Sequence, residues 1–280
     1  MDKAAHKDAP GASADAAYRY RKFTTRLLFR DLRFRRGSAR VGDHIPTFEL
    51  FTTEGDRSTI EDLAGGRPVL LIFGSLTCPM TASAVPTLKA LYREFAERVE
   101  FVMLNVREAH PGEHLPQPET VEEKLDHARA LAHFYAMPWT VVSDDIDGHL
   151  HRSLDPKPNS AFLIDADGVI VFRSLWASDR RGLNQALESV ANGEKPVKPE
   201  SSALVVPVAR AMGHVQGVME RAGPQAVGDL WWSAFPMALA GRLATVFPAL
   251  SPDQRGICAA LTLALSFLVI VAGIGMWALR

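Results

Sequence analysis

The sequence predicts a mixed α/β domain, followed by a helical region and one transmembrane helix. The run 69–73 is continuously apolar, as in a strand that is buried on both faces of a sheet. Apolar residues with a helical period begin shortly after it, at Pro79. Near the end of the chain, the 24 residues 256–279 carry no formal charge. A helix of that length spans about 36 Å, enough to cross a hydrocarbon core of about 30 Å.

The elements of the α/β domain follow one another in the order β-α-β-α-β-β-α. The last two strands are joined by Asp165-Ala-Asp-Gly168, a hairpin turn with glycine where a positive φ is expected. This order, preceded by a short extra strand, predicts a thioredoxin-like fold with an N-terminal extension. Strands are expected at 47–51, 69–73, 99–106, 140–143, 161–164 and 169–172, and helices at 79–98, 121–135 and 179–191.

Four parts are expected along the chain, because charge and hydropathy change between them. The first is basic: nine Lys or Arg residues between Arg19 and Arg40 stand against one acidic residue, Asp31. We expect this arm to be partly helical and either solvated or in contact with anionic lipid. The parts are a disordered and basic arm at 1–40, a thioredoxin-like domain at 41–193, a linker with amphipathic or interfacial helices at 194–255, and the transmembrane anchor at 256–279.

Composition narrows the classes of function. Two cysteines, of which Cys258 lies in the apolar stretch, make no disulfide framework and suit a reducing compartment. No secretory signal opens the chain. No set of three or four convergent metal ligands can be named, and His149 and His151 are expected in a solvated turn. We therefore expect no bound cofactor, no metal and no nucleic-acid partner.

The topology of the anchor is predicted from the basic residues around it. Arg221, Arg242 and Arg255 precede the anchor, and only Arg280 follows it. The positive-inside rule then predicts a single-pass membrane protein whose catalytic domain lies on the cytoplasmic side.

Cys78 is the candidate nucleophile. It stands between a central strand and a helix whose first residue is expected to be Pro79. At such a helix N-terminus the free N–H groups and the dipole favour the thiolate, so we expect a lowered thiol pKa. The alternative is a buried, inert cysteine. No second cysteine is nearby, so an oxidised Cys78 needs an external thiol reductant or a thioredoxin-type partner.

Glu108 and His110 follow the next predicted strand. The carboxyl ends of neighbouring parallel strands lie side by side, so both side chains could face Cys78 as proton donors or acceptors. The alternative is that they are ordinary polar loop residues.

Two segments resemble the iodothyronine deiodinase family, within the thioredoxin-like redoxins. They are Phe-Gly-Ser-Leu-Thr-Cys-Pro at 73–79 and Glu-Ala-His-Pro at 108–111. The resemblance extends from Val41 to Ala191. The family has selenocysteine at the position of Cys78 and cysteine at that of Leu76, and its Ser, Thr, Glu and His match Ser75, Thr77, Glu108 and His110.

The resemblance implies a reaction and roles for these residues. Cys78 would attack the iodine of an aromatic small molecule, and a thiol would regenerate the protein. His110, Glu108 and Ser75 would move protons, with Thr77 as a further site residue. The chain departs from the family in several respects. A thiol is a poorer nucleophile than a selenol, and the family's resolving cysteine is Leu76 here. A family tyrosine is Asn105, the anchor is C-terminal, and the family's basic hormone clamp has no match.

Two other functions stay open. In a one-cysteine peroxidase, Ser75 would take the place of the hydroxyl residue three positions before Cys78, although Leu71 stands where that family has proline. The second of these functions is non-catalytic: the chain would be a membrane-tethered redoxin scaffold. The sequence is compatible with a homodimer and leaves open whether Pro158 is the cis-proline that the thioredoxin fold usually carries near its active cysteine.

Overall fold

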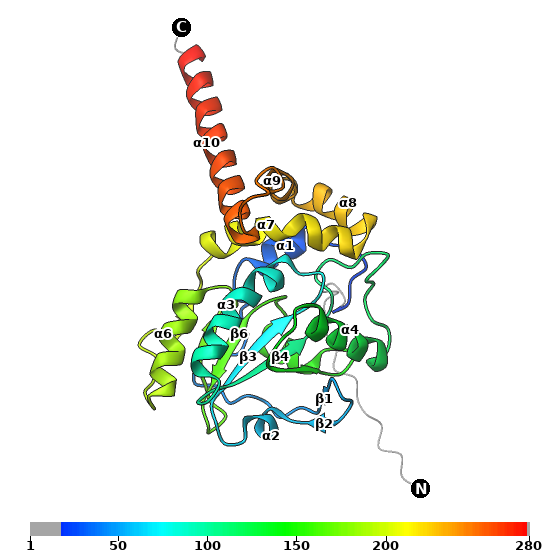
Figure 1. The fold of residues 1–280 in the computed structure, drawn as a ribbon, viewed down its shortest axis with the longest axis vertical. Coiled ribbons are helices and arrows are strands. Elements are labelled where there is room, and N and C mark those ends of the chain that lie inside the picture. Colours follow the sequence, from blue (N-terminus) through cyan, green and yellow to red (C-terminus); the bar gives the residue numbers. More distant parts are fainter. Residues whose placement is uncertain (1–17, 279–280) are drawn as a thin grey trace.

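The computed structural model describes residues 18–278, which form one eight-stranded mixed sheet with helices around it (Figure 1). The strands are β1 (Leu50–Thr52), β2 (Arg57–Ser58), β3 (Val69–Gly74), β4 (Glu100–Asn105), β5 (Thr140–Ser143), β6 (Ala161–Ile164), β7 (Ile170–Ser174) and β8 (Glu200–Ser201). Their order across the sheet is β2-β1-β5-β4-β3-β6-β7-β8.

Helices account for most of the remaining regular structure in this part of the chain. They are α1 (Thr25–Asp31), α2 (Ile60–Ala64), α3 (Pro79–Phe95), α4 (Val121–Phe134), α5 (His149–Leu154), α6 (Arg180–Ala191), α7 (Val205–Ala222), α8 (Pro224–Ser233), α9 (Phe235–Ala244) and α10 (Pro252–Ala278).

The central strand β3 is buried at every residue because helices cover both faces of the sheet. Alternate side chains of a strand point to opposite faces. Leu70 and Ile72 therefore join the cluster formed with α3, α4 and α6. Leu71 and Phe73 join the opposite cluster, which includes residues of α2 and α5.

The pairing around β3 determines where the site lies. β4 runs parallel to β3, from the pair Val69–Glu100 to the pair Gly74–Asn105. β6 pairs antiparallel on the other side. Since β3 and β4 end opposite each other, the loops that follow Gly74 and Asn105 lie side by side.

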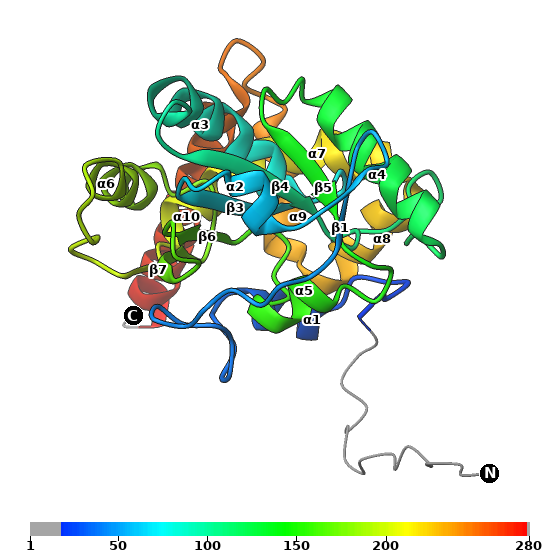
Figure 2. The ribbon, with the colours of Figure 1, turned by 90° about the horizontal axis from the view of Figure 1, so that it is seen from below.

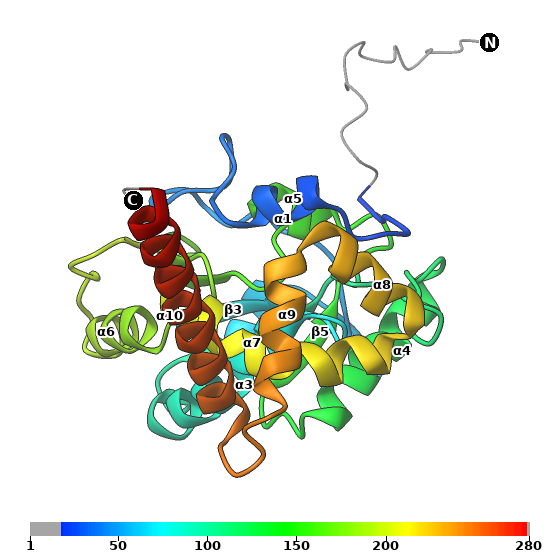
Figure 3. The same cartoon turned by 90° about the horizontal axis from the view of Figure 1, so that it is seen from above.

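The C-terminal helices α7, α8 and α9 lie over this end of the sheet, together with α1 (Figures 1 and 3). We call these four helices the helical cover. They share one apolar cluster with the domain below: Phe23 and Leu27 from the N-terminal segment and Met212 from α7 pack with Cys78 and Trp176.

Polar contacts fasten the helical cover to the loop that follows β4. The Glu113 carboxylate accepts the backbone N–H of Gln225 at 2.9 Å, at the start of α8. The N–H of His114 donates to the carbonyl of Ala222 at 2.9 Å, at the end of α7. A carboxylate at a helix N-terminus is favourable because it satisfies free N–H groups and faces the positive end of the dipole.

The N-terminal segment also contacts the loop that follows β4. It lies at the lower edge of the molecule in Figure 2. The Arg107 guanidinium lies 5.0 Å from the ring centroid of Tyr18 and 5.2 Å from that of Tyr20. The Tyr20 hydroxyl donates to the carbonyl of Ala109 at 2.9 Å. Of the arm predicted at 1–40, the described residues from 18 onward thus pack on the domain, and residues 1–17 lie outside the described part.

Helix α10 leaves the helical cover and extends away from the rest of the molecule (Figure 1). Among the described residues, α10 is the helix that is long and apolar enough to cross a bilayer: the candidate span is Pro252–Met276, and an 18-residue window within it has mean hydropathy 2.7. Its base is docked on α7 at two glycines: a Cβ on Gly213 would lie 1.7 Å from the Pro252 carbonyl oxygen, and one on Gly256 would lie 2.3 Å from that of Ala209.

The predicted fold class is confirmed. The strands predicted at 140–143 and 161–164 match β5 and β6 at both ends, and the helix predicted from Pro79 ends three residues early, at Phe95. Helices were predicted within 194–255, where α7, α8 and α9 lie, but no bounds were predicted for α5, α8 and α9. The prediction of a solvated turn at His151 is wrong, because this side chain is fully buried in α5 and bonds the Lys157 carbonyl at 2.7 Å.

The close crossing of α7 and α10 generates a test. Gly213→Ala should destabilise the protein by about 1–3 kcal/mol, because overpacking forces the two backbones apart. Its thermal midpoint in detergent should fall by about 2–4 °C per kcal/mol. Gly217→Ala, in the same helix but with no atom within 4 Å of the added Cβ, is the matched control. It should gain about 0.5–1 kcal/mol from helix propensity. Equal midpoints for the two variants would contradict the close docking.

Candidate active site

Cys78 is the N-cap residue of α3, with Pro79 in the first turn. The short loop between β3 and α3 is closed by the Cys78 N–H, which donates to the Ser75 carbonyl at 3.3 Å. Gly74 allows this turn, because a Cβ there would lie 2.4 Å from the sulfur of Met103. The sequence-based placement of Cys78 at a strand-to-helix junction is therefore confirmed.

The buried Glu108 carboxylate connects the Cys78 loop to the loop after β4. Its Oε2 accepts the Thr77 N–H at 3.0 Å and the Thr77 hydroxyl at 2.6 Å. The same hydroxyl accepts the backbone N–H of His110 at 3.1 Å. Ser75 adds a second connection, since its Oγ accepts the N–H of Ala109 at 3.3 Å. The two bonds to the Glu108 carboxylate are charge-assisted, and such hydrogen bonds are about twice as strong as neutral ones.

The other oxygen of Glu108 bonds to a histidine that the sequence did not single out. Nδ1 of His127, on α4, lies 2.8 Å from Oε1 of Glu108. Partial burial lowers the pKa of His127, but the hydrogen bond and the negative charge of Glu108 outweigh it, so the pKa is raised overall. The Glu108 carboxylate is thus held between Thr77 and His127.

Cys78 and His110 line one small apolar cavity of about 50 Å³ between the α/β domain and the helical cover. The ring of His110 packs against Phe23, with 4.2 Å between ring centroids. Its Nδ1 has no hydrogen-bond partner within residues 18–278. Burial lowers the pKa of His110 to about 3, so its imidazole is neutral at physiological pH.

The expectation of an ionised Cys78 is wrong for this closed arrangement. The thiol is 1% exposed, and burial raises its pKa to about 11. The backbone N–H groups of Thr81 and Met80 and the Thr81 hydroxyl act in the opposite direction, as expected at a helix N-terminus, but the loss of hydration is larger. The helical cover, and not the local turn, therefore controls the protonation of Cys78.

The five candidate residues separate into two groups in space. Cys78 and His110 line the cavity. Ser75, Thr77 and Glu108 are fully buried beside it and bond to backbone groups and to one another. This arrangement holds the loops after β3 and β4 in place. The Glu108 carboxylate does not line the cavity.

Asp31 is a cavity residue that sequence reasoning did not select. It belongs to α1, is 7% exposed and lines the same cavity as Cys78. Burial raises the pKa of its carboxyl, while Arg107, Arg30 and Lys157 act to lower it. Its position as the single acid among nine basic residues was the available signal.

Pro158 also lines the cavity. The peptide bond before it is trans, because no peptide bond between residues 18 and 278 is cis. The amide of the next residue, Asn159, donates to the Phe73 carbonyl at 2.9 Å and so holds this loop against the end of β3.

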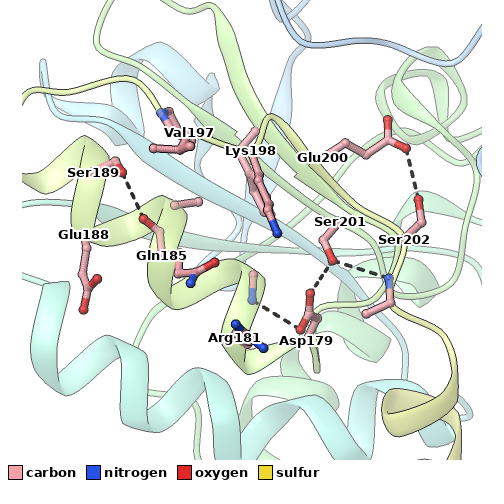
Figure 4. Close-up of a pocket in the computed structure, with 15 residues that line it drawn as sticks. Asp179, Arg181, Gln185, Glu188, Ser189, Val197, Lys198, Glu200, Ser201 and Ser202 are labelled. Atoms are coloured by element: carbon pink, nitrogen blue, oxygen red, sulfur yellow. Dashed lines mark hydrogen bonds between the residues drawn. The ribbon is translucent and has the colours of Figure 1, made fainter.

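A larger groove of about 660 Å³ lies elsewhere, between α6 and the segment 196–203 (Figure 4). Its polar groups are bonded to their neighbours: Ser201 bonds to Asp179, and Ser202 donates to Glu200 at 3.1 Å. Its lining holds no cysteine or histidine among the described residues. It is therefore not a candidate for thiol chemistry.

A sheet of this order, with a cysteine at the start of the helix that follows its central strand, defines the class of thioredoxin-like proteins. The model of the family described as Redoxin matches residues 40–188, which is more than half of the chain. The chain belongs to the redoxin family.

Comparisons with individual proteins agree with this class. Over 147 residues the chain is 24% identical to the thioredoxin-like protein YneN of Bacillus subtilis, covering 52% of this chain and 78% of that protein. It is 30% identical over 104 residues to thyroxine 5-deiodinase of Homo sapiens, covering 33% and 34% of the two chains. The match to type II iodothyronine deiodinase of Fundulus heteroclitus is 24% over 119 residues, covering 38% and 45%. The chain thus spans less than half the length of these deiodinases.

A hypothetical protein of Sinorhizobium meliloti superposes with a TM-score of 0.49 and 16% identity, covering 60% of this chain and 93% of that chain.

The raised pKa of Cys78 predicts an unusual pH profile of alkylation. In a Cys258→Ser background, the rate of reaction of the native protein with iodoacetamide should keep rising with pH until about 11. A pKa raised from 9.0 means a thiolate fraction about 100-fold smaller at pH 8, so the native thiol should also react slowly there. The denatured protein is the control and should level off near pH 9. A native profile that levels off below pH 8 would contradict the effect of the helical cover.

The link between Thr77 and Glu108 predicts an asymmetric mutational effect. Thr77→Val should lower the free energy of unfolding by about 1–3 kcal/mol, because it leaves the buried Glu108 carboxylate without one donor. Thr77→Ser keeps the hydroxyl and should recover most of the loss. Urea unfolding of both variants in detergent is the measurement. A loss confined to Thr77→Ser, with Thr77→Val as stable as the wild type, would show that the methyl group of Thr77, and not its hydroxyl, matters.

Proposed function

We propose that the protein is a membrane-anchored thiol oxidoreductase that resembles the deiodinases and in which Cys78 is the nucleophile. One observation carries the proposal: a cysteine at a helix N-terminus and a neutral histidine share an apolar cavity at the end of the central strand. The likeness of 73–79 and 108–111 to the deiodinases supports reductive dehalogenation as the reaction.

The residues of this chain can supply each proton transfer in that reaction. The neutral His110 imidazole accepts the Cys78 proton as the substrate binds. The thiolate then attacks the halogen, so that a sulfur–halogen bond forms while the carbon–halogen bond breaks. The carbanion left on the substrate takes the proton from His110.

An external thiol closes the cycle. It attacks the sulfur of Cys78, releases halide and forms a mixed disulfide. A second thiol then releases Cys78 as a thiol and leaves as the disulfide of the two reductants. In sum, one carbon–halogen bond is reduced to carbon–hydrogen, two thiols are oxidised to one disulfide, and halide and a proton are released.

The membrane part of the proposal is supported by α10. Its outward side chains are apolar over most of its length, including Leu265, Phe267 and Val269, each more than half exposed. In water such a surface would be unfavourable, whereas a bilayer would cover it. The basic residues before α10 favour a domain on the cytoplasmic side.

A second function is supported by a different observation. Cys78 is almost fully buried, and its pKa is raised. A thiol in that state is the one expected of a non-catalytic redoxin domain that serves as a membrane-tethered scaffold. Peroxide reduction has less support, because Ser75 is fully buried and does not line the cavity that holds Cys78.

Turnover measurements separate these functions. The full-length protein in liposomes would be supplied with dithiol and with iodothyronine, iodotyrosine or a hydroperoxide. We expect iodide release, and we expect its rate to fall by at least 100-fold in Cys78→Ser, because of the two cysteines it is Cys78 that lines the cavity. Cys258→Ser is the matched control and should stay active. Peroxide turnover without iodide release would favour the peroxidase. Turnover that is unchanged in Cys78→Ser would exclude Cys78 as the nucleophile, and no turnover of any of these substrates would favour the scaffold.

A further inference from the structure

The opening of the Cys78 cavity is asymmetric. The lining residues contributed by the redoxin domain, which include Pro79, Met80 and Trp176, are all buried. The partly exposed lining residues within the described part of the chain all come from the helical cover or the residue next to it. They are Leu28 on α1, Leu32 just after α1, Val208 on α7 and Met237 on α9. Any route from outside to the thiol therefore passes between α1, α7 and α9.

This side of the molecule is the one from which α10 leaves, as the view from above shows (Figure 3). Leu263 of α10 packs on the apolar cluster that contains Cys78. The apolar cluster that contains Cys78 therefore extends to the base of the candidate membrane helix.

The surface around the opening suits the interfacial region of a bilayer. Large apolar side chains project from the helical cover: Phe29 is 64% exposed, Trp232 91% and Phe235 56%. Trp is enriched where protein meets the membrane interface. Basic residues of the same helices, such as Arg210 and Arg242, are suited to anionic headgroups.

The cavity itself suits an apolar guest. Three methionines line it, Met80, Met212 and Met237. Methionine side chains are unbranched and polarizable, so they adapt to guests of different shape. At about 50 Å³ the cavity has room for a slim apolar group, and a larger one would need these side chains to move.

We propose that the substrate of Cys78 is an apolar molecule dissolved in the bilayer, which reaches the thiol laterally through the opening between α1, α7 and α9. This inference rests on the proposed function, because it requires both a reactive Cys78 and a membrane-spanning α10. It assigns the substrate class by solubility: the molecule arrives from the lipid phase and not from water.

The test compares two maleimides of equal intrinsic reactivity, one carrying an octyl chain and one carrying a sulfonate. The full-length Cys258→Ser protein in phosphatidylcholine–phosphatidylserine vesicles would be treated with each, and modification of Cys78 followed by mass spectrometry. The octyl reagent should react faster by about tenfold or more, a factor that corresponds to 1.4 kcal/mol.

A pair of variants on α9 controls for accumulation of the octyl reagent in the bilayer. Met237→Glu places a charge in the opening and should reduce the octyl rate by about tenfold or more. Leu239→Glu, also partly exposed on α9 but outside the cavity lining, should leave the octyl rate at its original value.

The outcomes distinguish the two proposals. Equal rates for the two reagents, or a faster sulfonate reagent, would overturn lateral entry while Cys78 remains a reactive thiol. Equal effects of the two α9 variants would do the same. If neither reagent modifies native Cys78 and both modify it after denaturation, the proposed function fails, and the lateral entry fails with it.

Discussion

The parallel pairing of β3 with β4 is the constraint from which the site follows. It ends both strands at one level, so that the loop carrying Cys78 and the loop carrying His110 emerge as neighbours. Backbone pairing alone would leave the loops free to separate. The Glu108 carboxylate prevents this, because it is buried and accepts two hydrogen bonds from Thr77. A buried carboxylate is costly without donors, so the arrangement has few alternatives.

Desolvation then decides what the site can do at rest. Burial raises the pKa of the Cys78 thiol to about 11 and lowers that of the His110 imidazole to about 3, so transfer of the proton from Cys78 to His110 is strongly unfavourable in the closed cavity. The helix N-terminus offsets only part of this. The thiol is therefore protected against adventitious oxidation while the helical cover is closed, and chemistry requires a guest or a movement that brings polar groups to the pair.

Local patterns were sufficient to predict the sheet and the position of Cys78. The apolar run 69–73, the proline after the cysteine and the hairpin at 165–168 each act over a few residues. The helical cover could not be predicted in the same way. Helices α8 and α9 are ten residues each, carry little periodic pattern and are arranged by contacts with loops about 100 residues away, such as Glu113 with Gln225. The thiol pKa was mispredicted for the same reason, since burial is a property of the tertiary structure.

The glycine crossing between α7 and α10 has a mechanical consequence. When a helix is joined to a domain only through a flexible loop, the domain can adopt many orientations relative to the helix. Here the base of α10 is in backbone contact with α7, and Asp253 accepts a hydrogen bond from His214 at 2.8 Å. The domain can therefore change its orientation only together with α10. In the proposed membrane-anchored arrangement, the Cys78 sulfur would stay at a nearly constant distance from the bilayer, and its encounters with reaction partners would be confined to two dimensions.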